Sequence, residues 1–288
     1  MSAKHFFEAL LLKTVFSGFR GMSLDMASFT GGTLARAIGP FLPAHQTAKK
    51  NLKLAYPNLS RDEEYKLLSD MWDNLGRTAA ELPHLPGKLF SRVDISGLEH
   101  IPKDSKPALF FSAHLGNWEL NAPMAFRNGV NLAVIYRHAN NPYVDEMIRS
   151  LRASQCNDQF AKGPKGGAGL MRALRAKQSI AMLIDQKMND GIALPFFGHN
   201  AMTATAIAEL ALRFDLPIIP AHIVRTKGAH FKGYVSPPIA YAKTGDKDKD
   251  VRAIMLAINR MVEGWIREYP EQWFWVHKRW PKEAWGIK

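Results

Sequence analysis

The sequence is poor in cysteine, with one residue, Cys156, among 288. A single thiol can form neither an internal disulfide bond nor a cysteine-based zinc site. No reactive-cysteine motif surrounds Cys156, so we expect an inert, partly buried thiol rather than a nucleophile. The ten histidines show no spacing of two histidines and an acid that is typical of a metal site, and no metal is expected.

Acidic residues are scarce relative to basic ones. The chain has 38 Lys and Arg against 26 Asp and Glu, a formal net charge of +12. This charge favours an acidic partner, such as nucleic acid, an anionic membrane surface or an acidic carrier protein. No zinc-finger, ribonucleoprotein or homeodomain pattern is present, so nucleic acid is not expected as a partner. Sixteen Phe and seven Trp accompany the basic residues, a combination that suits an interface of lipid headgroups.

A hydrophobic run of the roughly 20 residues that a membrane-spanning helix needs is also missing. The run 6–19 is apolar but contains charged residues, and the run 26–42 is interrupted by an arginine, a proline and several glycines. No cleavable signal peptide is convincing. We expect both runs to form helices that lie on a membrane surface; ordinary core helices of a soluble protein are the alternative.

The chain divides into a helical part and a part with strands. Residues 1–88 are expected to be a helical, membrane-associating region, and residues 89–288 an α/β domain, although both could form one continuous domain. The capping box Ser60–Glu63 begins a helix. Strands are predicted at 93–95, 108–113, 132–136, 179–184, 217–224 and 230–235, and helices at 142–151, 203–214 and 249–269. Strands separated by helices predict a mostly parallel central sheet flanked by helices.

The segment Pro107–Glu119 is the most informative stretch. A buried, strand-like run ends on His114, a Gly-Asn turn follows, and Glu119 lies five positions after the histidine. A base and an acid that orients it would then lie at the carboxyl end of a strand, where α/β proteins usually carry their chemistry. A structural histidine paired with an acid at a helix start is the alternative. In the turn, Gly116 permits tight geometry, and Asn117 is more easily a helix N-cap than a substrate contact.

Two further residues follow predicted strands. Arg137 and Asp185 would face the same edge as His114 if the sheet is parallel. The guanidinium of Arg137 suits a substrate phosphate or an oxyanion. Asp185 would pair with Arg137 or with a substrate group, or would cap a helix.

Basic residues also gather in two other places. Lys162 directly precedes a glycine-rich loop, 163–169, that contains Lys165; the loop lacks the Gly-Lys-Ser/Thr of a Walker A motif, but together with these lysines it could contact a phosphate or headgroup. Arg172 and Arg175 follow on a basic helix that could dock an acidic carrier protein. Near the C-terminus, His277 and Arg279 lie among tryptophans, a pattern that favours a phosphorylated lipid at an interface.

Several blocks together resemble a known family. They are Ser96-Gly-Leu-Glu-His-Ile-Pro102, Phe111-Ser-Ala-His-Leu-Gly-Asn-Trp-Glu119, Val134-Ile-Tyr-Arg137 with Asn140-Asn-Pro142, Asp185-Gln186 with Pro195-Phe-Phe-Gly198 and Thr203-Ala-Thr205, and Gln272-Trp-Phe-Trp-Val-His-Lys-Arg279. In this order they resemble the bacterial lipid A biosynthesis acyltransferases, within the lysophospholipid acyltransferase superfamily. The resemblance covers nearly the whole chain.

The resemblance implies an activity and a place. Such enzymes move an acyl chain from acyl carrier protein to a hydroxyl of a phosphorylated glycolipid, a lipid A precursor, at the cytoplasmic face of the bacterial inner membrane, without a cofactor. It makes His114 the general base and Glu119 the acid that holds its imidazole. Many members carry an N-terminal membrane helix that is clearer than the one in this chain. The protein would therefore be either peripheral or anchored by its N-terminus.

Other functions stay open. An acyltransferase of the same superfamily could act on a lysophospholipid or an aminolipid, but the usual glycerophospholipid enzymes have Asp in place of Glu119 and a Pro-Glu-Gly-Thr-Arg type of block, which is missing here. A non-catalytic basic protein that binds membranes and a metal hydrolase are further alternatives. The donor could be coenzyme A instead of a carrier protein, and the sequence sets no acyl chain length.

Overall fold

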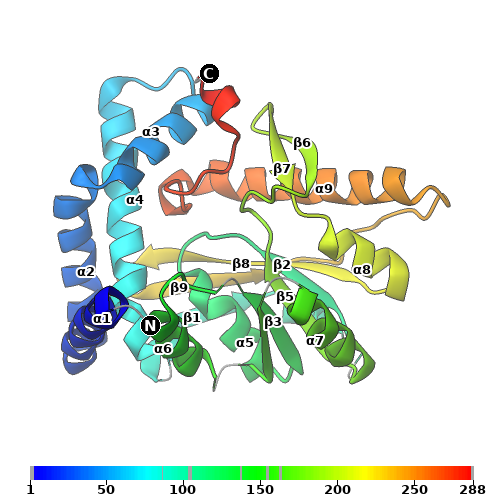
Figure 1. The fold of residues 1–288 in the computed structure, drawn as a ribbon, viewed down its shortest axis with the longest axis horizontal. Coiled ribbons are helices and arrows are strands. Elements are labelled where there is room, and N and C mark those ends of the chain that lie inside the picture. Colours follow the sequence, from blue (N-terminus) through cyan, green and yellow to red (C-terminus); the bar gives the residue numbers. More distant parts are fainter. Residues whose placement is uncertain are drawn as a thin grey trace.

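The computed structural model describes residues 3–85, 87–102, 106–136, 138–153, 156–161 and 164–286. Their central element is a seven-stranded sheet in the order β1-β9-β8-β2-β5-β3-β4 (Figure 1). The strands are β1 (Val93–Ser96), β2 (Leu109–Ser112), β3 (Leu132–Tyr136), β4 (Asp158–Ala161), β5 (Ser179–Leu183), β8 (Ile218–Lys227) and β9 (His230–Val235).

Five neighbouring strands of this sheet run in the same direction. β8, β2, β5, β3 and β4 pair in parallel, whereas β9 pairs with β8 in antiparallel fashion and β1 pairs in parallel with β9. The predicted mostly parallel sheet is therefore confirmed. Because β2, β5 and β3 are parallel neighbours, the residues that follow them meet at one edge of the sheet.

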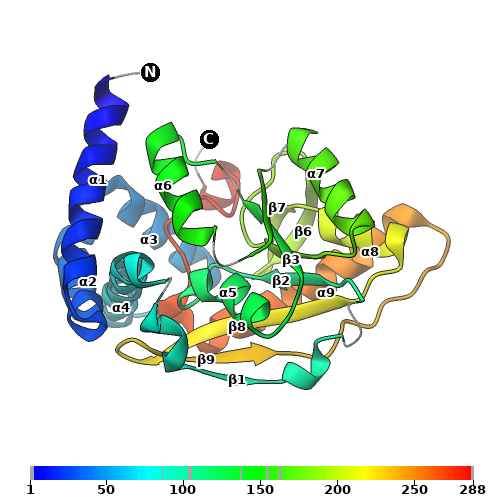
Figure 2. The same ribbon diagram turned by 90° about the horizontal axis from the view of Figure 1, so that it is seen from below.

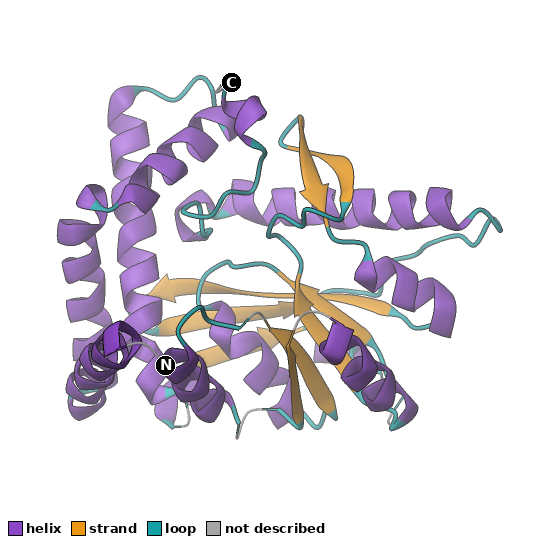
Figure 3. Ribbon diagram, in the orientation of Figure 1, coloured by secondary structure: helices purple, strands orange, loops and turns teal. Residues whose placement is uncertain are grey.

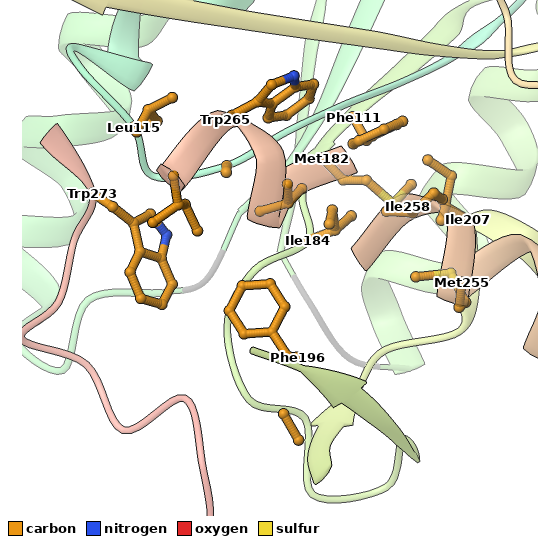
Figure 4. Close-up of a cluster of buried hydrophobic side chains, with 14 of the residues drawn as sticks. Phe111, Leu115, Met182, Ile184, Phe196, Ile207, Met255, Ile258, Trp265 and Trp273 are labelled. Carbon is orange, nitrogen blue, oxygen red and sulfur yellow. The ribbon is translucent and has the colours of Figure 1, made fainter. Parts of the chain in front are cut away.

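Helices cover both faces of the sheet (Figures 1 and 3). α9 (Lys247–Glu268) lies on one face, and α5 (Asn121–Arg127) lies on the other. Alternate residues of β2 face opposite sides, as a pleated strand requires: Phe111 stacks on Trp265 of α9 at 5.6 Å between ring centroids, whereas Phe110 packs toward α5. Figure 4 shows the larger core, in which Phe111 and Trp265 lie near Ile258 and Met182. The remaining helices of this part are α6 (Pro142–Arg152), α7 (Pro164–Arg175) and α8 (Ala206–Phe214).

Among the described residues, four α-helices precede the sheet: α1 (Ala3–Gly21), α2 (Leu24–Ile38), α3 (Pro43–Ala55) and α4 (Arg61–Glu81). The predicted capping box of Ser60 and Glu63 begins α4. α2 and α4 cross closely at two glycines, since a Cβ on Gly31 would lie 2.5 Å from the carbonyl oxygen of Gly76. In Figure 2, α1 leads away from α2, and its first half lies beside α6. In the part of the chain that the structure describes, no helix is long and apolar enough to cross a membrane.

Two local predictions were wrong. The glycine-rich segment 164–169 is not a loop but the first half of α7, and Gly169 lies so close to β4 that a Cβ would come within 2.4 Å of the Phe160 ring. The sequence analysis also missed a hairpin, β6 (Ile192–Phe196) and β7 (His199–Thr203), which occupies part of the block Pro195–Thr205. Its two-residue turn has positive φ at both Phe197 (51°) and Gly198 (75°), and phenylalanine is an unusual residue for that conformation.

Candidate active site

His114 and Asp185 form a hydrogen-bonded pair at the carboxyl edge of the sheet. In the register of β2 and β5, Ser112 lies opposite Leu183, so the residues two positions further along each strand are also neighbours. His114 Nδ1 lies 2.7 Å from Asp185 Oδ1, and the backbone N–H of His114 donates to Asp185 Oδ2 at 2.9 Å. The parallel pairing of two strands thus brings together residues that are 71 positions apart.

Asp185 is well suited to hold a charged imidazole. It is 1% exposed, and its Oδ2 also accepts a hydrogen bond from Trp273 Nε1 at 2.8 Å. Burial alone would raise the pKa of Asp185, but His114 and the hydrogen bonds that it donates hold that pKa below its usual range. An ionised carboxylate at Nδ1 stabilises the tautomer with the proton on Nδ1, which leaves Nε2 of His114 able to accept a proton.

The C-terminal segment closes over this pair. The Phe274 N–H donates to the His114 carbonyl at 3.0 Å, the Gly116 N–H donates to the Gln272 carbonyl at 3.1 Å, and Leu115 forms a bridge with Trp273. The Phe274 ring stacks on the His114 imidazole at 5.6 Å. Residues 272–274 therefore pair with the turn that carries the base, although more than 150 residues separate the two segments in the sequence.

Glu119 does not contact His114 in this structure, contrary to the predicted hydrogen bond between the two. Its carboxylate instead accepts two hydrogen bonds from Arg152, Nε to Oε2 at 2.8 Å and Nη2 to Oε1, and a third from Trp118 Nε1 at 3.2 Å. The short helical turn at 118–120 directs Glu119 toward the end of α6. The carboxylate that binds the imidazole here is that of Asp185, at Nδ1, and not that of Glu119.

The turn between His114 and Glu119 is held tightly. Gly116 has a φ of +59°, and a Cβ at this position would lie 2.2 Å from the carbonyl oxygen of Ile223, so the tight geometry predicted for Gly116 is confirmed. Asn117 occupies the N-cap position of the helical turn 118–120, as expected, but its side chain makes no cap hydrogen bond and donates instead from Nδ2 to Glu81 Oε2 at 2.8 Å. It is 1% exposed, which leaves it little surface for a substrate.

The other predicted site residues fall into three groups. Arg137 and Lys162 lie outside the described residues, as does the side chain of Lys165, so the predicted pairing of Asp185 with Arg137 lies there too. Arg172 and Arg175 are on the last turn of α7, and both are exposed. A substrate group was one of the alternative partners expected for Asp185, but both of its oxygens are bound within the protein.

The predicted headgroup contacts of His277 and Arg279 were wrong. Arg279 is fully buried and donates to the Met202 carbonyl and to Thr203 Oγ1, at 2.9 Å each. His277 directs both ring nitrogens at backbone carbonyl oxygens, those of Phe274 and Asp185, and burial lowers its pKa to about 4. Both ring nitrogens of His277 thus face backbone oxygens, and the nitrogen of Arg279 that has no partner, Nε, is buried out of reach of a lipid phosphate.

Sequence reasoning also missed residues that support the site, above all Arg152, Glu81, Gln272 and Trp273. A signal for Asp185 as the partner of His114 was present, since each residue stands two positions after a buried strand. Using it requires the knowledge that β2 and β5 are neighbours, which the sequence alone does not provide. Burial raises the pKa of Cys156 to about 11, which disfavours the thiolate that a nucleophile needs. Among the described residues, no group of three or more His, Cys, Asp or Glu could hold a metal ion.

Comparisons with known proteins find acyltransferases that are similar to this chain. Residues 5–282 match the model of the family described as bacterial lipid A biosynthesis acyltransferase. The chain is 24% identical to the lipid A biosynthesis palmitoleoyltransferase of Escherichia coli (strain K12), over 87% of this chain and 83% of that protein. It is 23% identical to the lauroyltransferase of the same organism, over 83% and 79% of the two chains. The crystal structure of the 1-acyl-sn-glycerophosphate acyltransferase of Thermotoga maritima aligns with 83% of this chain and 95% of its own, with a TM-score of 0.38 and 14% identity.

Proposed function

The chain belongs to the bacterial lipid A biosynthesis acyltransferases, and from this premise we propose that it transfers a fatty acyl chain from the thioester of acyl carrier protein to a hydroxyl group of a lipid A precursor, with His114 as general base. Its class is accordingly that of an O-acyltransferase. The observation that carries the proposal is the pair of His114 and Asp185 at the carboxyl edge of the sheet.

In the proposed reaction, His114 Nε2 takes the proton of the acceptor hydroxyl while the hydroxyl oxygen attacks the thioester carbonyl carbon. The C–O bond forms, the tetrahedral intermediate collapses, and the C–S bond breaks. The imidazolium returns its proton to the departing thiolate, so no covalent acyl-enzyme is needed. Asp185 holds the ring by Nδ1 and stabilises the imidazolium, the part that the acid plays in a serine triad.

Glu119 has a different part in this scheme. Its carboxylate is bound by Arg152, and Trp118, which donates to the same carboxylate, packs on the His114 ring at 5.3 Å between centroids. Glu119 therefore supports the Trp118 wall of the site and fastens the turn to α6, while the proton transfer belongs to the His114–Asp185 pair. The proposal moves the orienting role from Glu119 to Asp185.

A lipid acceptor requires that the site reach a membrane surface. The N-terminal helices and the turn after them expose large apolar side chains, namely Phe6, Phe7, Leu10, Leu11, Val15, Met26, Phe29, Leu34, Ile38, Phe41 and Leu42. Basic residues such as Lys13 and Arg20 are exposed on α1 as well. α1 contacts α6 through the rings of Phe6 and Tyr143, and Arg152 at the other end of α6 binds Glu119 of the catalytic turn. We assign this surface to peripheral binding at the cytoplasmic face of the inner membrane, where an acyl carrier protein can meet the lipid.

The test is a transfer assay with purified protein, a membrane-extracted lipid A precursor and a set of acyl carrier protein thioesters, with products identified by mass spectrometry. The precursor should gain the mass of one acyl chain, and His114→Ala should lower the rate by about 10²- to 10⁴-fold. His138→Ala is the matched control, because His138 follows β3 at the same edge and its side chain is 60% exposed.

Two outcomes would contradict the proposal in different ways. Transfer to a lysophospholipid but not to the lipid A precursor would keep the chemistry and change the acceptor. A His114→Ala variant as active as the His138→Ala control would remove His114 as the base. Replacing the carrier thioesters with coenzyme A thioesters in the same assay identifies the donor.

A further inference from the structure

Glu81, the last residue of α4, is a buried carboxylate with several hydrogen-bond donors around it. It is fully buried and accepts from Ser28 Oγ of α2 at 2.7 Å and from Asn117 Nδ2 at 2.8 Å. Arg225 of β8 donates to both of its oxygens, from Nη1 and, at 3.0 Å, from Nη2. Burying a carboxylate is costly unless its charge is paired and its lone pairs are used, and both kinds of contact are present here.

Arg225 extends this network along α4. Its Nε donates to Asn74 Oδ1 at 2.9 Å, and its Nη2 donates to Thr78 Oγ1 at 3.2 Å. Asn74 and Thr78 in turn both donate to the carbonyl oxygen of Gly116, at 3.1 and 3.2 Å. Two successive turns on one face of α4 therefore bind the backbone carbonyl of Gly116.

These contacts act on the turn that carries the base. Gly116 is bound at its carbonyl by α4 and at its N–H by Gln272, and Asn117 is bound at its side chain by Glu81. Asp185 fixes the rotation and the tautomer of the His114 ring, but it does not fix where the backbone after His114 runs. The position of Nε2 relative to a bound hydroxyl depends on the orientation of the ring and on the course of the backbone. Small displacements of a reacting group lower the reaction rate strongly.

We propose that Glu81 is a positioning residue for the acyl transfer: together with Arg225 it orients Asn74, Thr78 and Asn117 so that they hold the catalytic turn. This inference rests on the proposed role of His114 as base. It also gives the N-terminal helices a part in catalysis besides membrane contact, since Ser28 of α2 and three residues of α4 belong to the network.

The first test uses Thr78, where two substitutions separate packing from hydrogen bonding. Thr78→Val keeps the shape but cannot donate to the Gly116 carbonyl, whereas Thr78→Ser keeps the hydroxyl. We expect Thr78→Val and Asn117→Ala to lower kcat about tenfold with unchanged KM for both substrates, and Thr78→Ser to restore kcat. The pH at which kcat falls to half on the acid side should not move, because the His114–Asp185 pair is intact.

A stability control accompanies these variants. Leu68→Ala removes a buried side chain of the same helix that takes no part in the network, and it should lower the unfolding temperature with kcat unchanged at temperatures well below unfolding. Glu81→Gln leaves the buried Arg225 without its charge partner and should lower both the unfolding temperature and kcat.

The results discriminate cleanly. If Thr78→Val and Asn117→Ala keep the kcat of the unchanged protein while His114→Ala is inactive, the network is merely structural and the positioning role is refuted. If His114→Ala is itself active, the proposed function fails before the network is tested. A drop in kcat for Thr78→Val that Thr78→Ser does not rescue would also count against the hydrogen bond to Gly116.

Discussion

The two ends of the chain are both rich in aromatic and basic residues, yet the fold uses them in opposite ways. Near the N-terminus, Phe7 is 67% exposed and Phe41 is 87% exposed. Near the C-terminus, Trp273, Trp275 and Trp280 are at most 1% exposed. The sequence analysis predicted a membrane interface at both ends, and the structure leaves this possibility to the first alone.

The difference lies in the polar partners of the rings. Each of the three buried tryptophans donates its indole N–H within the protein: Trp273 to Asp185 Oδ2, Trp275 to the Pro270 carbonyl at 2.7 Å, and Trp280 to the Phe196 carbonyl at 3.1 Å. A tryptophan with a partner for its N–H can be buried at little polar cost. Aromatic and basic composition therefore indicates amphipathic side chains, but not whether water, lipid or protein covers them.

The largest expected effect tests the C-terminal side of this comparison, where Trp273 and Phe274 enclose the base and its acid. Asp185→Asn should lower kcat/KM by about 10³- to 10⁴-fold, because an amide stabilises the wrong imidazole tautomer; the corresponding change in a serine triad costs about 10⁴-fold. Glu119→Gln should cost about tenfold, since Arg152 loses a charged partner but His114 keeps its own. Steady-state kinetics on both variants decides between the two carboxylates, and a larger loss for Glu119→Gln would restore it as the orienting acid.

The second expected effect is on stability. Trp273→Ala removes a fully buried ring and should lower the free energy of unfolding by about 3–5 kcal/mol. Phe7→Ala, the matched truncation on the exposed N-terminal helix, should change it by less than about 0.5 kcal/mol. Chemical denaturation of both variants measures the difference, and equal losses would mean that α1 is as much a part of the core as the C-terminal segment.

The third expected effect is a dependence of the stability on pH, caused by a buried histidine of the sheet. His222 of β8 lies between Tyr234 and Trp265, at 5.0 and 4.3 Å between ring centroids, and burial lowers its pKa to about 4. The unfolded chain, with a histidine pKa of about 6.5, takes up a proton that the folded protein refuses, so stability should decline as pH falls from about 6.5 to 4.

At pH 5 this histidine should cost about 2 kcal/mol relative to pH 8. Thermal unfolding between pH 4 and 8 (about one unit apart) would show it, with His222→Phe as the comparison, because a phenyl ring fills a similar space and does not titrate. A variant that loses stability toward acid as steeply as the unchanged protein would assign the decline to other groups.

The features that were predicted correctly depend on residues that are close together in the sequence. The capping box of Ser60, the N-cap of Asn141 and the strand that ends before His114 depend on neighbours within a few residues, and all three are found in the structure. The hairpin β6–β7 was missed for a reason that is also local. The residue at its first turn position is Phe197, which is unusual for a turn of this type.

The contacts that complete the site are not local. Asp185 reaches His114 because β5 is the neighbour of β2, Glu119 reaches Arg152 because α6 ends beside the turn, and Trp273 returns from the far end of the chain. Each depends on strand order or helix packing, which the hydrophobic pattern of one sequence does not determine. The residue types of the site could thus be predicted, and their pairing could not.

The smallest expected effect tests the N-terminal side of the comparison. Phe7→Ser with Leu11→Ser removes two apolar side chains that are each 67% exposed. If these side chains enter a lipid surface, the affinity for vesicles of phosphatidylethanolamine and phosphatidylglycerol should fall at least about tenfold, since burial of one such side chain is worth about 1.5–3 kcal/mol. The unfolding temperature should not change, because neither side chain contributes to the core.

Tyr65→Ser is the control for this experiment. Tyr65 is 76% exposed near the start of α4. α1 lies at the other end of this helix, where His84 contacts the Phe19 carbonyl. Figure 1 shows α1 and the start of α4 well apart. Vesicle sedimentation should therefore show unchanged binding for Tyr65→Ser. Equal binding by the Phe7/Leu11 double variant and the unchanged protein would mean that the exposed apolar side chains of α1 serve another purpose, and the contrast between the two ends of the chain would then concern burial alone.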